Sequence, residues 1–591
     1  MEKLHRKHKH KHKHKHNAGR PLAAILLSVL LGLGLAAGPV TASVADHSEF
    51  EASLAAPYRG DVSGARSFTL VFDYPLAAAP QSVAWRLELL APNGRVVRRW
   101  DGAQALVRGP VSVDVRWNGR IGSGAAPAPA GMYRVRLQAR SRDAAAVAAR
   151  VRAPAAPDAV VLQQWDIAVG RIDAPPMPAF RALPMAGAGA DLNAAPAPGT
   201  LPYAVYLGNL HSQSSHSDGG GALASCRGAQ EPQSGAFGPT DAYTFAHKRG
   251  LDILVTSEHN HMYDGSDGTN AAAEPAAASA LFQSGLTAAA DYNAVHPGFL
   301  AVYGLEWGVI ANGGHLNIFN SAELLGWERN ASGQLLADTL TPKSDYAALY
   351  ALMRQRGWVG QFNHPASSGQ FLVGGVPLGY SVDGDQAMAL CEVVNTTAFS
   401  ANASETEVRR SNFESACNKA LEAGYHVAFS TNQDNHCANW GASYTNRTGV
   451  LLPLGRPLDN AAFIDALKAR RVFATMDKGS QLVLTANGRL MGERFVNRGA
   501  LALVAYFANV AGKAVSTVTM FEGVPGRNGR VSVLSTSASS TITPAPGEHF
   551  YYVRLTQDDG NMLWSAPVWV TQLAGTVTGA VQRRPADAQY R

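Results

Sequence analysis

Hydrophobic and polar residues alternate with a period of two between Ser67 and Arg142. The alternating segments are SFTLVFDY, VAWRLELLA, VSVDVRWNG and YRVRLQAR, and turn-forming sequences such as PNG and GSGAAPAPAG separate them. Period-two alternation with frequent turns is typical of antiparallel β-sandwiches. We therefore expect an immunoglobulin-like β-sandwich over residues 46–172. The same pattern returns in LVLTANG, LALVAYFAN, VSTVTMFEG and HFYYVRLTQ, and it predicts a second such sandwich over residues 479–573.

The middle of the chain follows another pattern, in which a capping residue, an amphipathic helix, a glycine and an apolar strand come in this order. Thr240 precedes the helical segment DAYTFAHKR, Gly250 follows it, and LDILVTS is typical of a buried strand. The pattern recurs in SDYAALYALMRQRGWVGQFN and in SNFESACNKALEAGYHVAFST. Such units favour parallel strands joined by helices. We therefore expect a parallel sheet with covering helices over residues 201–478.

The two ends and one internal segment differ in composition from the rest. Residues 1–45 begin with a cationic stretch, continue with the apolar run PLAAILLSVLLGLGLAAG and end in small residues. This is the layout of a secretory signal peptide, so we expect a secreted or periplasmic protein. Only an uncleaved segment would place the protein at a membrane. The Ala- and Pro-rich residues 173–200 are typical of a linker, and residues 574–591 of a polar tail.

The excess positive charge of the chain lies at its N-terminus. The chain has 51 Lys and Arg against 45 Asp and Glu, but eight of these bases and only one acid lie in the first 45 residues. The remaining chain is slightly acidic, so its charge gives no reason to expect a nucleic-acid partner. Four cysteines in an exported chain allow up to two disulfides, and the three ways of pairing them stay open.

Residues of metal-binding type gather in short groups between residues 208 and 436, and three groups, SEHNH, NHPA and NQDNH, directly follow predicted strands. The carboxyl ends of parallel strands are where β/α barrels build their active sites. A mixed set of imidazoles and carboxylates suits Zn²⁺, Mn²⁺ or Fe²⁺ better than Ca²⁺, and we expect two to three such ions. The candidate metal ligands are His211, Gln213, Asp218, His259, Glu306, His315, His364, Asp434 and His436.

The order of these groups resembles the polymerase and histidinol phosphatase (PHP) family. Residues 209–219, NLHSQSSHSDG, keep the spacing of its first motif, D-L-H-x-H-T-x-x-S-D-G. Residues 250–260 keep that of its second, G-L-D-x-[IL]-x-[IV]-T-D-H-[ND], and a Glu–His pair, N-H-P and D-N-H follow. The resemblance spans residues 203–476. It implies an α/β fold, a distorted (β/α)7 barrel with a trinuclear metal centre, flanked here by the two predicted sandwiches.

The resemblance also assigns the ligands to three positions. Gln213 stands where the family has the second His of H-x-H, and an amide oxygen binds zinc-like ions less well than imidazole does. We therefore expect this position to be weak, to prefer a harder ion such as Mn²⁺ or Mg²⁺, or to be empty. Glu306, Asp434 and His436 are expected to act in catalysis as well. The implied positions are His211, Glu306 and Asp434; Asp218, His259 and His436; and His315 and His364 with Glu306 bridging.

Five further residues are weaker candidates for the site. His216 and His261 are candidates for its mouth, or for ligands. Glu392 and Asn395 are candidates for support of the ligands through hydrogen bonds. Arg447 is a candidate for a bidentate bond to a phosphate, or for a structural ion pair. Within the same resemblance, Cys226 and Cys437 both follow ligand-bearing loops, which suggests the disulfides Cys226–Cys437 and Cys391–Cys417.

These observations predict a secreted, metal-dependent phosphoesterase that cleaves mono- or diesters of small molecules or polymers with a metal-bridging hydroxide. The sequence has no G-x-S-x-G motif and no Cys–His pairing that would indicate a covalent nucleophile. Two alternatives stay open. The same site would cleave a carboxyl ester, a carbamate or an amide, or the chain would be a non-catalytic surface-binding protein with a degenerate barrel. We expect the sandwiches to contact the cell envelope.

Overall fold

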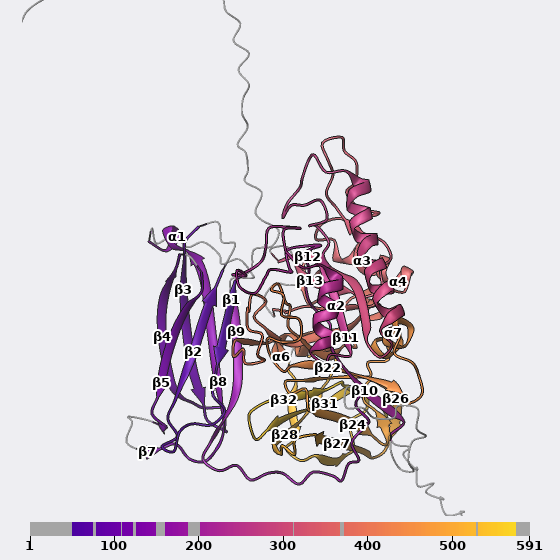
Figure 1. Ribbon diagram of the computed structural model, residues 1–591. Helices are drawn as coiled ribbons and strands as arrows, with labels where there is room; N and C mark the ends of the chain where they lie inside the picture. Colours follow the sequence, from indigo (N-terminus) through magenta and orange to yellow (C-terminus); the bar gives the residue numbers. More distant parts are fainter. Residues whose placement is uncertain are drawn as a thin grey trace, which may run out of the picture. The chain divides into compact units, whose positions relative to one another are not determined.

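The computed structural model describes residues 50–74, 79–107, 109–121, 126–148, 160–186, 201–310, 313–366, 371–527 and 530–574. The predicted signal segment, residues 187–200 of the predicted linker and residues 575–591 of the predicted tail lie outside these ranges. Strands account for most of the regular structure of the described residues (Figure 1). None of the described helices combines the length and the apolar character that a membrane span requires.

The N-terminal part contains two antiparallel sheets that share a hydrophobic core and a separate short pair of strands, β6 and β7. The first has the strand order β1-β2-β5 and the second β4-β3-β8-β9. Burial alternates along β2 and β8 as the period-two pattern requires, so that Leu70 and Leu137 are fully buried. The elements are β1 Glu51–Ala55, β2 Arg66–Asp73, β3 Gln81–Leu90, β4 Val96–Leu106, β5 Val111–Trp117, β6 Arg120–Ile121, β7 Ala126–Pro127, β8 Gly131–Asp143, α1 Ala144–Ala148 and β9 Val160–Val169.

The middle part contains the three predicted helix–strand units. Gly357 and Gly424 end two of the helices with φ of 71° and 120°, which glycine adopts without strain. The helices begin at other residues than predicted. Gly238 replaces Thr240 as the N-terminal cap of α2, and Asp345 caps α4 by accepting a hydrogen bond from a backbone N–H. The elements are β10 Tyr203–Asn209, α2 Pro239–Lys248, β11 Ile253–His259, α3 Pro275–Val295, β12 Leu300–Val309, β13 Gly314–Ile318, β14 Leu325–Gly326, β15 Thr339–Leu340, α4 Tyr346–Arg356, β16 Gly360–Phe362, β17 Leu372–Val373, β18 Val376–Pro377, α5 Val382–Ala387, β19 Met388–Thr396, β20 Arg410–Asn412, α6 Glu414–Ala423, β21 Ala428–Asn432, β22 Arg447–Pro453, α7 Asn460–Lys468 and β23 Val472–Thr475.

The predicted (β/α)7 barrel is wrong. Strands β10, β11 and β12 are parallel, as are β16, β19 and β21, but β13 lies between these two groups and is antiparallel to both β12 and β16. Strand β22 is likewise antiparallel to β10. The connection from Val309 to Gly314 is too short for a helical crossover, so the chain must return in the opposite direction. The result is a mixed sheet in a predominantly β protein.

The C-terminal strands extend this mixed sheet. Strand β23 pairs with β32, which continues through β31 and β28 to β29, while a second sheet has the order β25-β24-β27-β30. The predicted boundary near residue 478 therefore separates segments that share one hydrogen-bonded sheet. The elements are β24 Ser480–Ala486, β25 Arg489–Leu490, β26 Arg494–Arg498, β27 Leu501–Asn509, β28 Val515–Gly523, β29 Ser532–Ser535, β30 Ser539–Ile542, β31 Gly547–Gln557, β32 Met562–Ser565 and β33 Val568–Leu573.

A buried arginine joins all three parts of the chain. Arg554 of β31 contacts Asp166 of β9 at 2.7 Å and also Glu414 of α6, and its side chain is 6% exposed. Burial lowers the pKa of Arg554, but the charges of Glu414 and Asp166 outweigh this effect and raise it above its usual value. The guanidinium therefore stays charged and holds the two carboxylates together.

Replacing Arg554 with Met is expected to lower the free energy of unfolding by about 3 to 5 kcal/mol, because it leaves the buried carboxylate of Glu414 without its cation, whereas Asp166 keeps Arg134 at 3.0 Å. Urea unfolding followed by tryptophan fluorescence measures this change. The matched control is Arg489→Met, since the pair of Arg489 with Glu493 is 55% and 44% exposed and should contribute little. An equal effect of the two substitutions would contradict the bridging role.

Candidate metal centre

The candidate ligands come from the ends of neighbouring strands in the mixed sheet. His211 and Asp218 follow β10, His259 ends β11, and Glu306 lies in β12. The pairing of β11 with β12 places His259 directly opposite Glu306. The remaining candidates lie in β13, after β16 and after β21, and all of them are buried: His315, His364, Asp434 and His436.

Glu306 lies at the centre of this cluster. Its carboxylate oxygens approach His211 Nε2 at 2.9 Å, His315 Nδ1 at 3.2 Å, His364 Nε2 at 3.3 Å and His259 Nδ1 at 3.7 Å. Four imidazoles therefore surround one fully buried carboxylate. Burial raises the pKa of Glu306, but the charges of His211, His315 and His259 outweigh it and hold the pKa well below its usual value.

Two further carboxylates complete the cluster. His211 Nε2 lies 3.0 Å from Asp434 Oδ1, and Asp218 lies 3.4 Å from His436 Nε2 and 3.8 Å from His259 Nε2. Burial raises the pKa of Asp434, but His211 lowers it to about 2. Burial lowers the pKa of His436, but Asp218 raises it to about 10. Asp434 is thus ionised at neutral pH, as metal binding requires, and ion binding would release the proton of His436.

These side chains form three groups whose ligand atoms lie within 4.8 Å of one another. Each group combines imidazole with carboxylate, so the donor set fits borderline divalent ions such as Zn²⁺, Mn²⁺ or Fe²⁺. The second implied position matches one group in full. His364, however, lies with His211 and Asp434, whereas the resemblance placed it with His315. The groups are His211, His364 and Asp434; Asp218, His259 and His436; and His259, Glu306 and His315.

Two of these ligands have unusual backbone conformations. His364 has a φ of 28° and Asp434 a φ of 48°, in the region that glycine prefers. Each is the second residue after the end of a strand, β16 for His364 and β21 for Asp434. Backbone strain of this kind persists only where the surrounding structure imposes it, and it is common at functional sites.

Glu392 positions two of the ligands from behind. Its carboxylate lies 3.3 Å from His211 Nδ1 and accepts a hydrogen bond from the backbone N of His364 at 2.8 Å. Asn432 and Asn395 also donate to it, at 2.9 and 3.3 Å. A carboxylate at Nδ1 favours the tautomer whose Nε2 is a ligand, so Glu392 and Asn395 support the cluster as the sequence suggested.

Gln213 contacts the cluster as a hydrogen-bond donor. Its Nε2 donates to Glu306 at 2.6 Å, and its Oε1 accepts a hydrogen bond from Ser217 at 2.9 Å. The amide oxygen, which is the atom that binds metal ions, is therefore engaged elsewhere.

Three weaker candidates contact other partners. His216 Nδ1 lies 2.7 Å from the hydroxyl of Tyr303, and burial lowers the pKa of His216 to about 4. His261 Nε2 lies 3.2 Å from Asp267. Arg447 donates to Glu405 at 3.0 Å and to several backbone carbonyls. Within the described chain, neither histidine joins one of the three ligand groups.

Sequence reasoning did not assign a role to two carboxamides around the cluster, Asn363 and Asn432. Asn363 Nδ2 donates to Glu306 and to Asn317 Oδ1, both at 2.8 Å. The Nδ2 of Asn432 donates to Glu392, and its Oδ1 accepts a hydrogen bond from the backbone N–H of Leu210. The available signal was the position of Asn363 directly before His364 and that of Asn432 at the end of β21, two residues before Asp434. Both disulfides suggested with the family resemblance, Cys226–Cys437 and Cys391–Cys417, are present.

No protein-family model and no curated protein matches this chain. Among solved structures, the fibronectin(III)-like modules of a Clostridium thermocellum protein are 14% identical, with 22% of this chain and 66% of that one covered and a TM-score of 0.12. A Parabacteroides merdae β-glucuronidase is 9% identical, with 89% and 64% covered and a TM-score of 0.18. A glycosyl hydrolase family 2 member from Bacteroides cellulosilyticus DSM 14838 is 9% identical, with 90% and 64% covered and a TM-score of 0.14. This chain spans less than two thirds of each of them, and TM-scores this low support no argument about fold or activity.

Metal analysis of the purified protein is expected to find two to three divalent ions per chain. His211→Ala and His364→Ala should each lose the same ion, because the two residues share a group, whereas Asp218→Asn should lose a different one. Inductively coupled plasma mass spectrometry after loading with Zn²⁺ or Mn²⁺ measures the content. The same losses in all three variants would contradict separate positions, and a folded protein without any ion would contradict the metal centre.

Replacing Gln213 with His is expected to strengthen ion binding at the group of His211 by about tenfold or more, because an imidazole would replace an amide that faces Glu306 with its nitrogen. Competition with a fluorescent chelator measures the affinity. The matched control is Gln433→His, a buried glutamine of the loop after β21 whose amide contacts Tyr444 and Ser443. An equal increase in ion affinity in both variants would show that Gln213 is not the residue that weakens ion binding at this group.

Proposed function

We propose that this protein is a metal-dependent hydrolase and that its substrate is a phosphate ester. The observation that supports it is the meeting of three buried imidazole–carboxylate groups around Glu306. Burying several carboxylates is costly unless cations neutralise them, and divalent ions do so while binding to the imidazoles. The order of the ligands along the chain agrees with the PHP resemblance, which is the reason to prefer phosphate esters.

When bound, divalent ions would supply Lewis-acid polarisation of the phosphoryl oxygens and activation of water at neutral pH. The chain's own residues hold the site in place and limit its contact with solvent. Glu392 orients His211, and Asn363 holds the carboxylate of Glu306. Such pre-formed contacts lower the cost of arranging charges around a reacting group.

The substrate would approach from the side of His364 and Asp434. These two residues are 6% and 5% exposed, whereas the other ligand-group residues are at most 1% exposed. Both line a cavity that lies between the cluster and the N-terminal part of the chain. Asp434 and His364 are therefore the ligands whose positions a substrate would affect directly.

A carboxyl ester is a second candidate substrate, because the described residues that line this cavity include no Lys or Arg to bind a phosphate dianion. In that case the bound ions alone would balance the charge of a phosphate. The two disulfides are compatible with an extracellular protein, which agrees with the predicted export.

Three chromogenic substrates test the proposal. The metal-loaded protein is expected to hydrolyse 4-nitrophenyl phosphate or bis(4-nitrophenyl) phosphate faster than 4-nitrophenyl acetate, and a chelator should abolish the activity. His211→Ala should lower kcat/KM by about a hundredfold or more. Preference for the acetate would favour the carboxyl-ester reading. No chelator-sensitive turnover of any of the three, with metal bound, would exclude the proposed hydrolase.

A further inference from the structure

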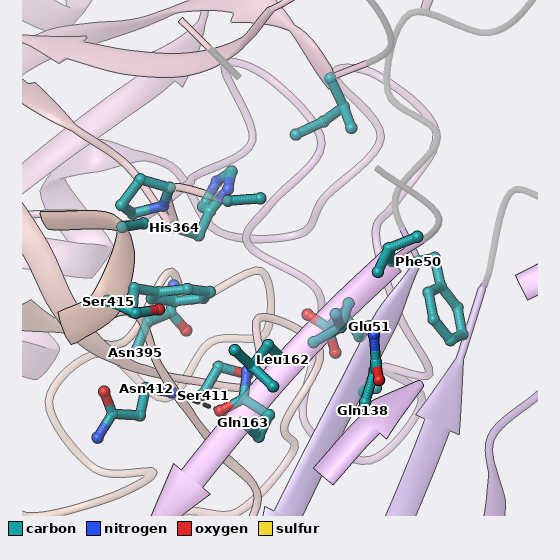
Figure 2. A pocket seen from close by; sticks show the side chains of 18 of the residues that line it. Phe50, Glu51, Gln138, Leu162, Gln163, His364, Asn395, Ser411, Asn412 and Ser415 are labelled. Atoms are coloured by element: carbon teal, nitrogen blue, oxygen red, sulfur yellow. Dashed lines mark hydrogen bonds between the residues drawn. The ribbon is translucent and has the colours of Figure 1, made fainter. Parts of the chain in front are cut away.

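The cavity next to His364 and Asp434 has a volume of about 210 Å³ and is bounded by two parts of the chain that are distant in sequence. Figure 2 shows His364 and Asn395 on one side of it and Phe50 and Glu51 on the other. Strands β1 and β9, which provide the second side, are edge strands of their sheets and pack against each other and against β20. The N-terminal sandwich thus closes the space in front of the metal centre.

Among the polar side chains of this wall, Gln163 of β9 gives the evidence that the cavity binds a molecule. It is fully buried and lines the cavity, and its Oε1 accepts a hydrogen bond from the backbone N of Asn412 at 2.6 Å. Within the described part of the chain, its Nε2 makes no hydrogen bond. A buried N–H donor without an acceptor is unfavourable and uncommon, so an oxygen of a bound molecule is its natural partner.

The rest of the wall limits the charge of that molecule. Glu51 contributes the only carboxylate from β1, and its Oε2 accepts a hydrogen bond from Thr397 at 2.8 Å. Phe50, Val161 and Leu162 supply apolar surface, and Leu162 is 38% exposed. An acid and a carboxamide among apolar side chains disfavour an anionic group and favour an uncharged polar one.

We propose that β1 and β9 form one wall of the substrate pocket and that Gln163 Nε2 donates a hydrogen bond to an oxygen of the substrate. The group that it binds is uncharged, carries a hydroxyl or carbonyl oxygen and lies next to the bond that is cleaved. This inference rests on the proposed hydrolase activity and specifies the part of the substrate beyond the phosphate. It also gives the N-terminal sandwich a role in substrate selection.

The test compares two phosphate esters that differ in the alcohol, glycerol 2-phosphate and phosphocholine. Gln163→Glu keeps an acceptor for the backbone N of Asn412 and replaces the donor with a carboxylate. It is expected to raise KM for glycerol 2-phosphate about five- to tenfold, with kcat within twofold, since one hydrogen bond is lost. KM for the cationic phosphocholine should stay equal or fall.

The matched control is Gln164→Glu, at the next position of β9, where successive side chains point to opposite faces. It should leave both KM values unchanged. Gln163→Met, which removes the donor without adding a charge, covers the case in which the buried carboxylate prevents folding. It should raise KM for glycerol 2-phosphate only.

The possible outcomes distinguish a failure of the role of Gln163 from a failure of the phosphoesterase proposal. Turnover of glycerol 2-phosphate by the wild-type protein, with the ratio of the two KM values unchanged in Gln163→Glu and Gln163→Met, would overturn the role of Gln163 alone. If the metal-loaded wild-type protein cleaves neither ester, the phosphoesterase proposal fails and the substrate pocket fails with it.

Discussion

The structure depends on the burial of one carboxylate, Glu306, among four imidazoles. A buried charge is tolerated only where opposite charges and hydrogen bonds compensate its loss of water, and here His211, His315 and His364 all lie within 3.3 Å of it. The register of β11 against β12 brings His259 opposite it as well. The mixed sheet is therefore the frame that holds this charge cluster, and every candidate ligand follows or belongs to one of its strands.

Neutral side chains satisfy the remaining polar atoms around the cluster. Asn363 and Gln213 donate to Glu306, and Asn432 donates to Glu392. Carboxamides supply hydrogen bonds without adding charge, so they hold the carboxylates in place and leave the balance of charge to the imidazoles and to any bound ions. Gln213 follows the same logic, since it is an uncharged donor to the carboxylate of Glu306.

The flanking strands are part of the site's construction. Arg554 connects the C-terminal strands to Asp166 of the N-terminal sandwich, and Gln163 of the same strand binds the backbone of Asn412. Strand β20, which contains Asn412, pairs with β19, which carries Glu392. Gln163 and the pairing of β20 with β19 thus link the N-terminal sandwich to the strand that carries Glu392. The edge strands β1 and β9, whose backbone groups would otherwise be exposed, are covered by this packing.

The sequence by itself determined the local features. These are the period-two strands, the three helices ended by glycines, the candidate ligands placed after strands and, through the family resemblance, the cysteine pairs. Their signals lie within short windows, where side-chain alternation and capping act. The barrel was mispredicted because the direction of β13 depends on a short connection and on its neighbours, β12 and β16. Only the tertiary structure decided that His364 joins His211, that Arg447 binds Glu405, and that Gln163 faces a cavity beside His364, because these contacts join residues far apart in the chain.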